Sequence, residues 1–204
     1  MDGLTAGHLI AFNTALFFAV AAPGPAFLVC LQAALAGGRR EGIVTGIGLA
    51  VTAGLWTLAA LLGLEAIFDA YPFVYTSMKI GGGLLVLAFA IQTWRYATRP
   101  IADSPPASPR RAFLRGFLLN LGNPKSILFS VGVLLVIFPP NLGTAAMLLV
   151  TLDHIVLEIV VYATLSTLVS RDAVRDRYLA AKPILMRAMG LVLGALGLRL
   201  LVAS

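Results

Sequence analysis

The sequence predicts an all-α integral membrane protein with six transmembrane helices, arranged as two inverted three-helix repeats with helices 1 and 4 broken at proline. Three observations lead to this prediction. The 204 residues are 59% hydrophobic and only 12% charged, whereas soluble domains are about 45–50% apolar and about 25% charged. Six apolar stretches are each long enough to cross a hydrocarbon core of about 30 Å. Proline breaks recur at matching positions in the two halves of the chain.

The apolar stretches cover approximately residues 9–35, 42–66, 73–95, 112–138, 143–169 and 184–203. The connections between them are short, so no soluble domain large enough to fold alone is expected. The chain starts Met1-Asp2-Gly3 and lacks the basic segment that opens a signal peptide. The first apolar stretch is therefore expected to remain as a helix.

Basic residues predict the orientation of the chain. Twelve of the fifteen flank the loops between helices 1 and 2, 3 and 4, and 5 and 6. The opposite loops, around Asp69-Tyr71 and Pro139-Asn141, carry no Lys or Arg. The positive-inside rule makes the basic side cytoplasmic and places both termini outside. This distribution explains the net charge of +6 without nucleic-acid binding.

The two proline breaks predict the repeats. Pro23 follows Ala11 at the same spacing at which Pro124 follows Ala112. Corresponding breaks in two halves point to a binding site near the membrane midplane of a transporter. The domain prediction is a first repeat over 1–97, a Pro-rich cytoplasmic linker over 98–110 and a second repeat over 111–204. Three spans in each half give the repeats opposite orientations.

The first break, Pro23-Gly24-Pro25, exposes backbone. Neither proline has an N–H, which releases the carbonyls of Ala19 and Ala21 from helical bonding. The helix is expected to restart near Ala26, leaving the N–H groups of Ala26, Phe27 and Leu28 without helical partners. A helix N-terminus attracts anions. The break therefore suits a substrate carboxylate or an ordered water, and the alternative is a structural kink satisfied by neighbouring helices.

The second break, Asn123-Pro124-Lys125, adds a charge. Pro124 releases the carbonyl of Asn120, and Asn120 and Asn123 supply amides at the same depth. Lys125 is expected near the bilayer centre, where a cation costs roughly 2.5–3.5 kcal/mol. It also begins a half-helix, whose dipole disfavours positive charge. A substrate anion or a fixed ion pair with a buried carboxylate would offset both effects.

Predicted helix 5 carries three candidates for proton or ion coupling: Asp153, His154 and Glu158. His154 and Glu158 are four residues apart and share a helical face. Asp153 and Glu158 diverge by about 140°, so both cannot point at one site. Intramembrane carboxylates and histidines often form proton relays. The alternative is that these residues make polar packing contacts.

Other chemistry finds little support. Cys30 is the only cysteine, so the chain has neither a redox pair nor a cysteine-rich metal site. His8 and His154 are too few for a haem or zinc centre. We expect no catalytic residues, no metal and no cofactor. A stripe on helix 2, formed by Gly42, Gly46, Ala50 and Gly54, predicts close helix packing inside the bundle or, alternatively, a homodimer face.

The chain resembles the LysE/RhtB family of bacterial amino-acid exporters along nearly its whole length. The segments that carry the resemblance are Ala22-Pro23-Gly24-Pro25, Gly38-Arg39-Arg40-Glu41-Gly42, Lys79-Ile80-Gly81-Gly82 and the run from Arg115 to Lys125 (RGFLLNLGNPK). The chain departs from the family at Ala22 and Ala26, where polar residues are usual. The resemblance implies a six-helix secondary transporter of the inner membrane that exports amino acids or related metabolites, driven by an ion gradient.

The sequence therefore predicts a secondary transporter for an amino acid or related small metabolite, not an enzyme. The substrate-binding candidates are Pro23, Gly24, Pro25, Asn120, Asn123, Pro124 and Lys125. The alternative is a metal-ion or small-ion permease or channel, which would need a ring of carboxylates. The expected partners are the substrate and the lipid bilayer.

Overall fold

The computed structural model describes residues 3–21, 24–64, 107–139 and 142–202, with isolated positions between 73 and 98. The regular elements in these ranges are all helices. They are α1 (Ala6–Ala21), α2 (Pro25–Ala59), the π-helix η1 (Ala60–Leu64), α5 (Pro109–Leu121), α6 (Pro124–Ile137), α7 (Thr144–Val169) and α8 (Asp172–Val202). The all-α prediction is confirmed for these residues. Pro23, most of the third apolar stretch and positions 99–106 of the expected linker lie outside them.

Two described segments are long and apolar enough to cross a membrane by length and composition, Pro25–Gly63 and Thr144–Val169. The second matches the predicted stretch 143–169 almost residue for residue. The shorter apolar helix Ala6–Ala21 precedes the first.

The chain is interrupted at both predicted breaks. Helix α1 ends at Ala21 and α2 starts at Pro25, and α5 ends at Leu121 before α6 starts at Pro124. Gly24 is extended and caps α2, and Pro25 occupies the first helical position, where its missing N–H costs nothing. The prediction that Leu28 lacks a helical partner is wrong, because its N–H donates to the Gly24 carbonyl at 2.9 Å.

The separation of helices 1 and 2 near residues 36–41 is also different from the prediction. Helical structure continues through this region, and the chain bends at Gly38 alone, with φ 81° and ψ 177°. Only glycine adopts this combination readily. A single residue thus replaces the expected loop, and Arg39 and Arg40 lie exposed directly after the bend.

The remaining helix boundaries follow local signals. Helix α5 starts with Pro109 after Ser108, whose hydroxyl accepts the Arg111 N–H at 3.4 Å. Helix α8 starts at Asp172, twelve residues before the predicted stretch 184–203, because the basic segment that precedes Pro183 is itself helical. The helix continues through Pro183.

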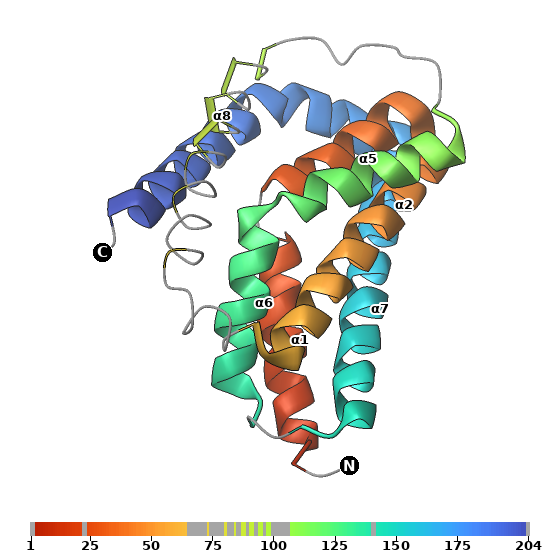
Figure 1. The fold of residues 1–204 in the computed structure, drawn as a ribbon. Coiled ribbons are helices and arrows are strands. Elements are labelled where there is room, and N and C mark those ends of the chain that lie inside the picture. The colour runs from red at the N-terminus through yellow and green to blue at the C-terminus, as the bar shows by residue number, and fades with distance from the viewer. Residues whose placement is uncertain are drawn as a thin grey trace.

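Figure 1 shows how the breaks divide the bundle. Helices α1 and α6 run beside each other on the side of the N-terminus, and α5 lies along α2 beyond the breaks. Helix α7 packs along α2 and also contacts α1. The core between these helices is centred on Phe12, Leu16, Leu49, Val150 and Tyr162, all at most 2% exposed.

The glycine stripe of α2 packs against α7. A Cβ atom at Gly42, Gly46 or Gly54 would collide with one α7 side chain each, those of Ser166, Tyr162 and Ile155 respectively. Ala50 in the same stripe is completely buried. The packing interpretation is confirmed, and this stripe is not a homodimer face.

The backbones of α2 and α5 approach each other closely at two glycines. A Cβ at Gly116 would meet the Thr45 carbonyl oxygen, and a Cβ at Gly48 would meet that of Phe113.

We expect Gly116→Val to destabilise the protein by about 3 kcal/mol or more, because rigid backbone cannot yield as a side chain does. Thermal unfolding in detergent would measure this loss. Gly122→Ala is the control, since nothing lies within 4 Å of its added Cβ. Equal melting temperatures for the two variants would contradict the described crossing.

Candidate functional site

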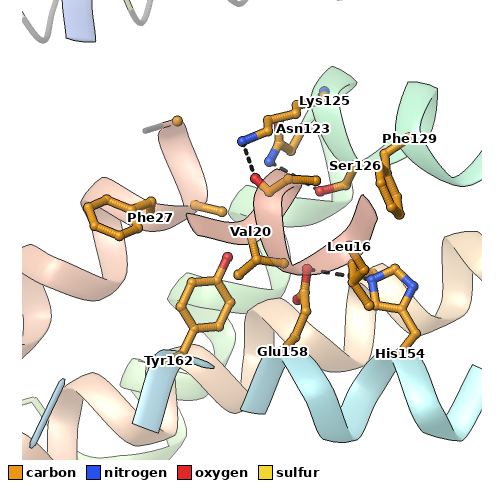
Figure 2. Close-up of a pocket in the computed structure, with 14 residues that line it drawn as sticks. Leu16, Val20, Phe27, Asn123, Lys125, Ser126, Phe129, His154, Glu158 and Tyr162 are labelled. Carbon is orange, nitrogen blue, oxygen red and sulfur yellow. Dashed lines mark hydrogen bonds and ion pairs between the residues drawn. The ribbon is translucent and has the colours of Figure 1, made fainter. Parts of the chain in front are cut away.

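A cavity lies where the two breaks meet the middle of α7 (Figure 2). The site is partly open, and the space between its lining residues is about 400 Å³ when open solvent is included. Helices α1 and α2 supply mainly apolar lining, including Leu16, Val20 and Phe27. The polar lining comes from α6, α7 and the second break: Asn123, Lys125, Ser126, His154, Glu158 and Tyr162. One wall is therefore apolar, and the opposite walls carry charge.

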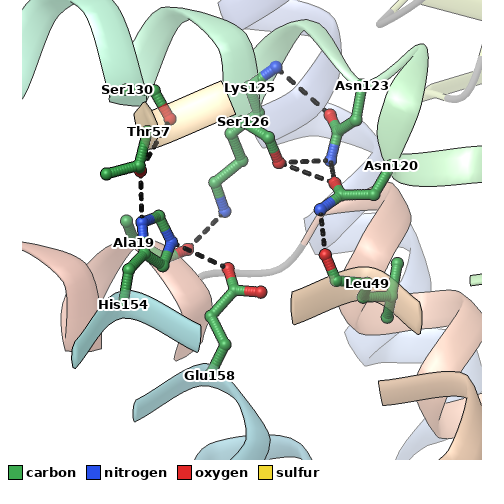
Figure 3. A network of polar contacts seen from close by, with 10 residues as sticks. All are labelled: Ala19, Leu49, Thr57, Asn120, Asn123, Lys125, Ser126, Ser130, His154 and Glu158. Atoms are coloured by element: carbon green, nitrogen blue, oxygen red, sulfur yellow. Dashed lines mark hydrogen bonds and ion pairs between the residues drawn. The ribbon is translucent and has the colours of Figure 1, made fainter. Parts of the chain in front are cut away.

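The side chain of Lys125 connects the two breaks. Its Nζ donates to the carbonyl oxygen of Ala19 at 2.6 Å (Figure 3). Ala19 lies four residues before Pro23, so this is a carbonyl that the sequence predicted to be released. The bond also places the ammonium near the C-terminal end of α1, where the helix dipole favours a cation. The dipole of α6 disfavours the positive charge of Lys125 at the start of that helix, and the dipole of α1 offsets this effect where the ammonium lies, near the end of α1.

The amides of the second break hold it against α2. Asn120 is fully buried, and its Nδ2 donates to the Leu49 carbonyl at 2.7 Å. Its Oδ1 accepts from Asn123 Nδ2 at 2.9 Å and from Ser126 Oγ at 2.6 Å. Asn120 thus binds α2 and is not part of the cavity lining.

Backbone groups at this break are satisfied locally. The Asn120 carbonyl, predicted to be released by Pro124, accepts the Asn123 N–H at 3.1 Å. Asn123 Oδ1 accepts the Lys125 N–H at 3.1 Å and so caps α6. This cap fixes the direction in which the Lys125 side chain leaves the helix.

Helix α7 presents His154 and Glu158 to the cavity on one face, as their spacing predicts. His154 Nε2 lies 3.5 Å from Glu158 Oε1, and both side chains are at most 7% exposed. The other carboxylate oxygen, Oε2, is buried and has no hydrogen-bond partner among the described residues. Leaving a carboxylate oxygen unpaired in a protein interior is unfavourable.

Asp153 points elsewhere. Its Oδ2 accepts from Asn13 Nδ2 of α1 at 2.9 Å, and it is not part of the cavity lining. The predicted divergence of the two acids is confirmed, and Glu158 is the one at the cavity.

The other predicted site residues are distributed as follows. Gly24 lines the cavity, whereas Pro25 is buried at the start of α2 and is not part of the lining. Pro23 lies outside the described residues, and Pro124 is described only as the first residue of α6. In the described ranges, no three His, Cys, Asp or Glu side chains gather as a metal site requires.

Sequence reasoning missed residues that line the cavity or contact its lining. Tyr162 follows Glu158 by one helical turn, so the same periodicity could have identified it. Thr57 of α2 contacts His154, with Oγ1 and Nδ1 2.6 Å apart. No local pattern marks Thr57, because its partner is 97 residues away.

Comparisons with known proteins add a family. A model described as LysE type translocator matches residues 17–204. The membrane protein YahN of Escherichia coli K12 is 29% identical over 183 residues, which cover 88% of this chain and 82% of that protein. A threonine efflux protein of Salmonella typhimurium is 32% identical over 147 residues, covering 68% and 71%. A leucine efflux protein of Enterobacter sp. is 28% identical over 172 residues, covering 81% and 80%. No solved structure matches.

Proposed function

This chain belongs to the LysE type translocator family and is a multi-pass membrane translocator rather than an enzyme, and we propose that it exports an amino acid with an uncharged side chain. The family resemblance seen in the sequence is thereby confirmed. Relatives named for threonine and leucine efflux support the substrate class. The alternative of a metal-ion or small-ion permease has no comparable support.

One observation carries the proposal: Lys125 and Glu158 line a single cavity at the junction of the two breaks. An amino acid is a zwitterion, and its two charges complement this pair. Its carboxylate would bind Lys125, with further donors at the start of α2 beside Gly24. Its ammonium would bind Glu158, whose Oε2 has capacity to accept a hydrogen bond.

The apolar wall supports an uncharged side chain. Leu16, Val20 and Phe27 face the substrate space opposite the polar groups. Ala26, where the family usually has a polar residue, is also part of this lining. A charged substrate side chain would lose hydration against this wall without gaining a partner there.

Export is proposed to be coupled to protons through Glu158 and His154. A proton on this pair would weaken its hold on the substrate ammonium, so proton entry and substrate release would be linked as in an antiporter. Asp153 accepts a hydrogen bond from Asn13 and is not part of the cavity lining, which supports a packing role rather than a coupling role for it.

The proposed architecture is two inverted repeats, 1–97 and 111–204, joined by the linker 98–110 in the inner membrane with both termini outside. Helix α1 would correspond to α5, and the start of α2 to α6, with the second repeat inverted in the membrane. The matching breaks support this correspondence. The contacts of α1 with α6 and of α5 with α2 also support it, because inversion would exchange these two pairs.

Efflux from proteoliposomes tests the proposed function. Vesicles would be preloaded with labelled threonine, leucine, lysine or glutamate, with and without an imposed pH gradient. We expect threonine or leucine to leave faster than lysine and glutamate, and faster with the gradient. Release no faster than from protein-free vesicles would contradict the proposal, and release of a divalent cation instead would favour the permease.

A further inference from the structure

The imidazole of His154 hydrogen-bonds a hydroxyl through one nitrogen, and its other nitrogen faces a carboxylate at ion-pair distance without a hydrogen bond. Thr57 Oγ1 lies 2.6 Å from Nδ1, while Nε2 faces Glu158 Oε1 at 3.5 Å. Thr57 Oγ1 also lies 3.4 Å from Ser130 Oγ of α6. Figure 3 shows this chain of contacts from α7 through α2 to α6. Thr57 is fully buried and Ser130 is 1% exposed.

The surroundings of His154 leave few other partners. The rings of Phe12 and Phe129 pack at 5.6 and 6.1 Å from the imidazole centre. The titratable groups that share its cavity are Glu158 and Tyr162 of α7 and Lys125 of α6, while α1 and α2 contribute none to the described lining. Among the described residues, one ring nitrogen of His154 therefore faces Glu158 and the other contacts Thr57.

Hydrogen-bond logic links these two contacts. When Glu158 is ionised and His154 is neutral, Nε2 must carry the proton, because a lone pair there would face the carboxylate. Nδ1 then accepts, so the Thr57 hydroxyl must donate to it. When a proton is added to Nδ1, the imidazolium donates to Thr57, and the Thr57 proton must turn away. Ser130 Oγ is an acceptor within reach for it.

We propose that Thr57 is a positioning residue for proton coupling, whose hydroxyl reverses between His154 and Ser130 as His154 loses or gains a proton. This inference rests on the proposed proton-coupled export. The step adds one proton to Nδ1 and rotates one hydroxyl, and no other bond forms or breaks. Thr57 would select the Nε2-protonated form of neutral His154 and give the charged form a partner.

The pH profile of export tests the role of Thr57. Thr57→Val keeps the shape of the side chain but removes the hydroxyl, so the imidazolium Nδ1–H is left without its acceptor. We expect the pH midpoint of export to move lower by up to about one unit, because the charged form of His154 loses a stronger hydrogen bond than the neutral form loses. Thr57→Ser is expected to keep the wild-type midpoint. Ser130→Ala is expected to shift it in the same direction by less.

Thr52→Val is the matched control. Thr52 is a fully buried threonine of the same helix, and its hydroxyl lies 3.0 Å from the carbonyl oxygens of Gly48 and Phe117. This variant loses a structural hydrogen bond but does not touch the cavity, so it is expected to keep the wild-type midpoint. A shift equal to that of Thr57→Val would show a general packing effect and overturn the proposal.

Nitrogen NMR of ¹⁵N-histidine-labelled protein in lipid tests the same inference without transport. The chain has two histidines, and a His8→Gln background leaves only His154. We expect neutral His154 to be protonated on Nε2, and Thr57→Val to give a mixture of tautomers with a lower protonation midpoint. An unchanged tautomer and midpoint in Thr57→Val would overturn the inference.

If Thr57→Val does not fold, an unchanged midpoint in Ser130→Ala would overturn it. If the wild type exports no amino acid, the proposed function fails, and these spectra still decide the role of Thr57.

Discussion

Lys125→Ala is expected to fold and insert but to lose export by at least tenfold. The variant removes the cation proposed to bind the substrate carboxylate, and hydrogen bonds to charged groups contribute about 1.5–3 kcal/mol. Lys125→Arg is expected to recover export poorly, because a guanidinium is larger and presents its donors in a fixed plane. Initial efflux rates from proteoliposomes with matched protein content would measure both effects.

Arg110→Ala is the control for loss of one positive charge. Arg110 is exposed near the start of α5 and is not part of the cavity lining, so this variant is expected to export at the wild-type rate. Normal export by folded Lys125→Ala would show that the charge has no role in the cycle.

A fixed ion pair between Lys125 and Glu158, the alternative to a substrate site, predicts different results. It requires that Lys125→Ala fail to fold, with a matching defect in Glu158→Gln. It also requires that the double variant regain stability, because no buried charge is then left unpaired. Melting temperatures of the two single variants and the double variant would distinguish a structural pair from a substrate site.

Glu158→Gln is expected to abolish acceleration of export by a pH gradient. The amide keeps nearly the same shape but does not titrate, so the His154–Glu158 pair loses its proton coupling. Downhill efflux in the absence of a gradient is expected to continue at a reduced rate. The measurement is efflux with and without an imposed gradient, reported as a ratio.

Asp153→Asn is the matched control for this substitution on the same helix. Asp153 binds Asn13 and lies outside the cavity lining, so its variant is expected to keep the wild-type ratio. If the ratio falls in Asp153→Asn and not in Glu158→Gln, the assignment of the coupling acid is wrong.

The sequence predicted the features that depend on local chemistry. Proline has no N–H, so both helix breaks and the released Ala19 carbonyl followed directly from the positions of the prolines. The period of an α-helix placed His154 and Glu158 on one face and Asp153 on another. Long apolar runs gave α7 within one residue at its start.

Features that depend on tertiary contacts were not predictable from local patterns. The choice between Asp153 and Glu158 depends on the rotation of α7 against α1 and α2, which glycine packing on the α2 stripe sets. Asn120 finds its acceptor in Leu49, 71 residues earlier in the chain. The segment from Gly38 to Gly42 supported the family resemblance, but its local pattern did not show that Gly38 alone would turn the chain where a loop was expected.

Binding of an amino acid and of its amide tests the central claim most directly, that Lys125 binds a substrate carboxylate where the two breaks meet. Isothermal titration of the purified protein would compare threonine with threoninamide and leucine with leucinamide. We predict that the wild type binds whichever of threonine and leucine it prefers at least tenfold more tightly than the amide of that amino acid. Lys125→Ala is predicted to lose this preference. Equal binding of acid and amide by the wild type would contradict the account.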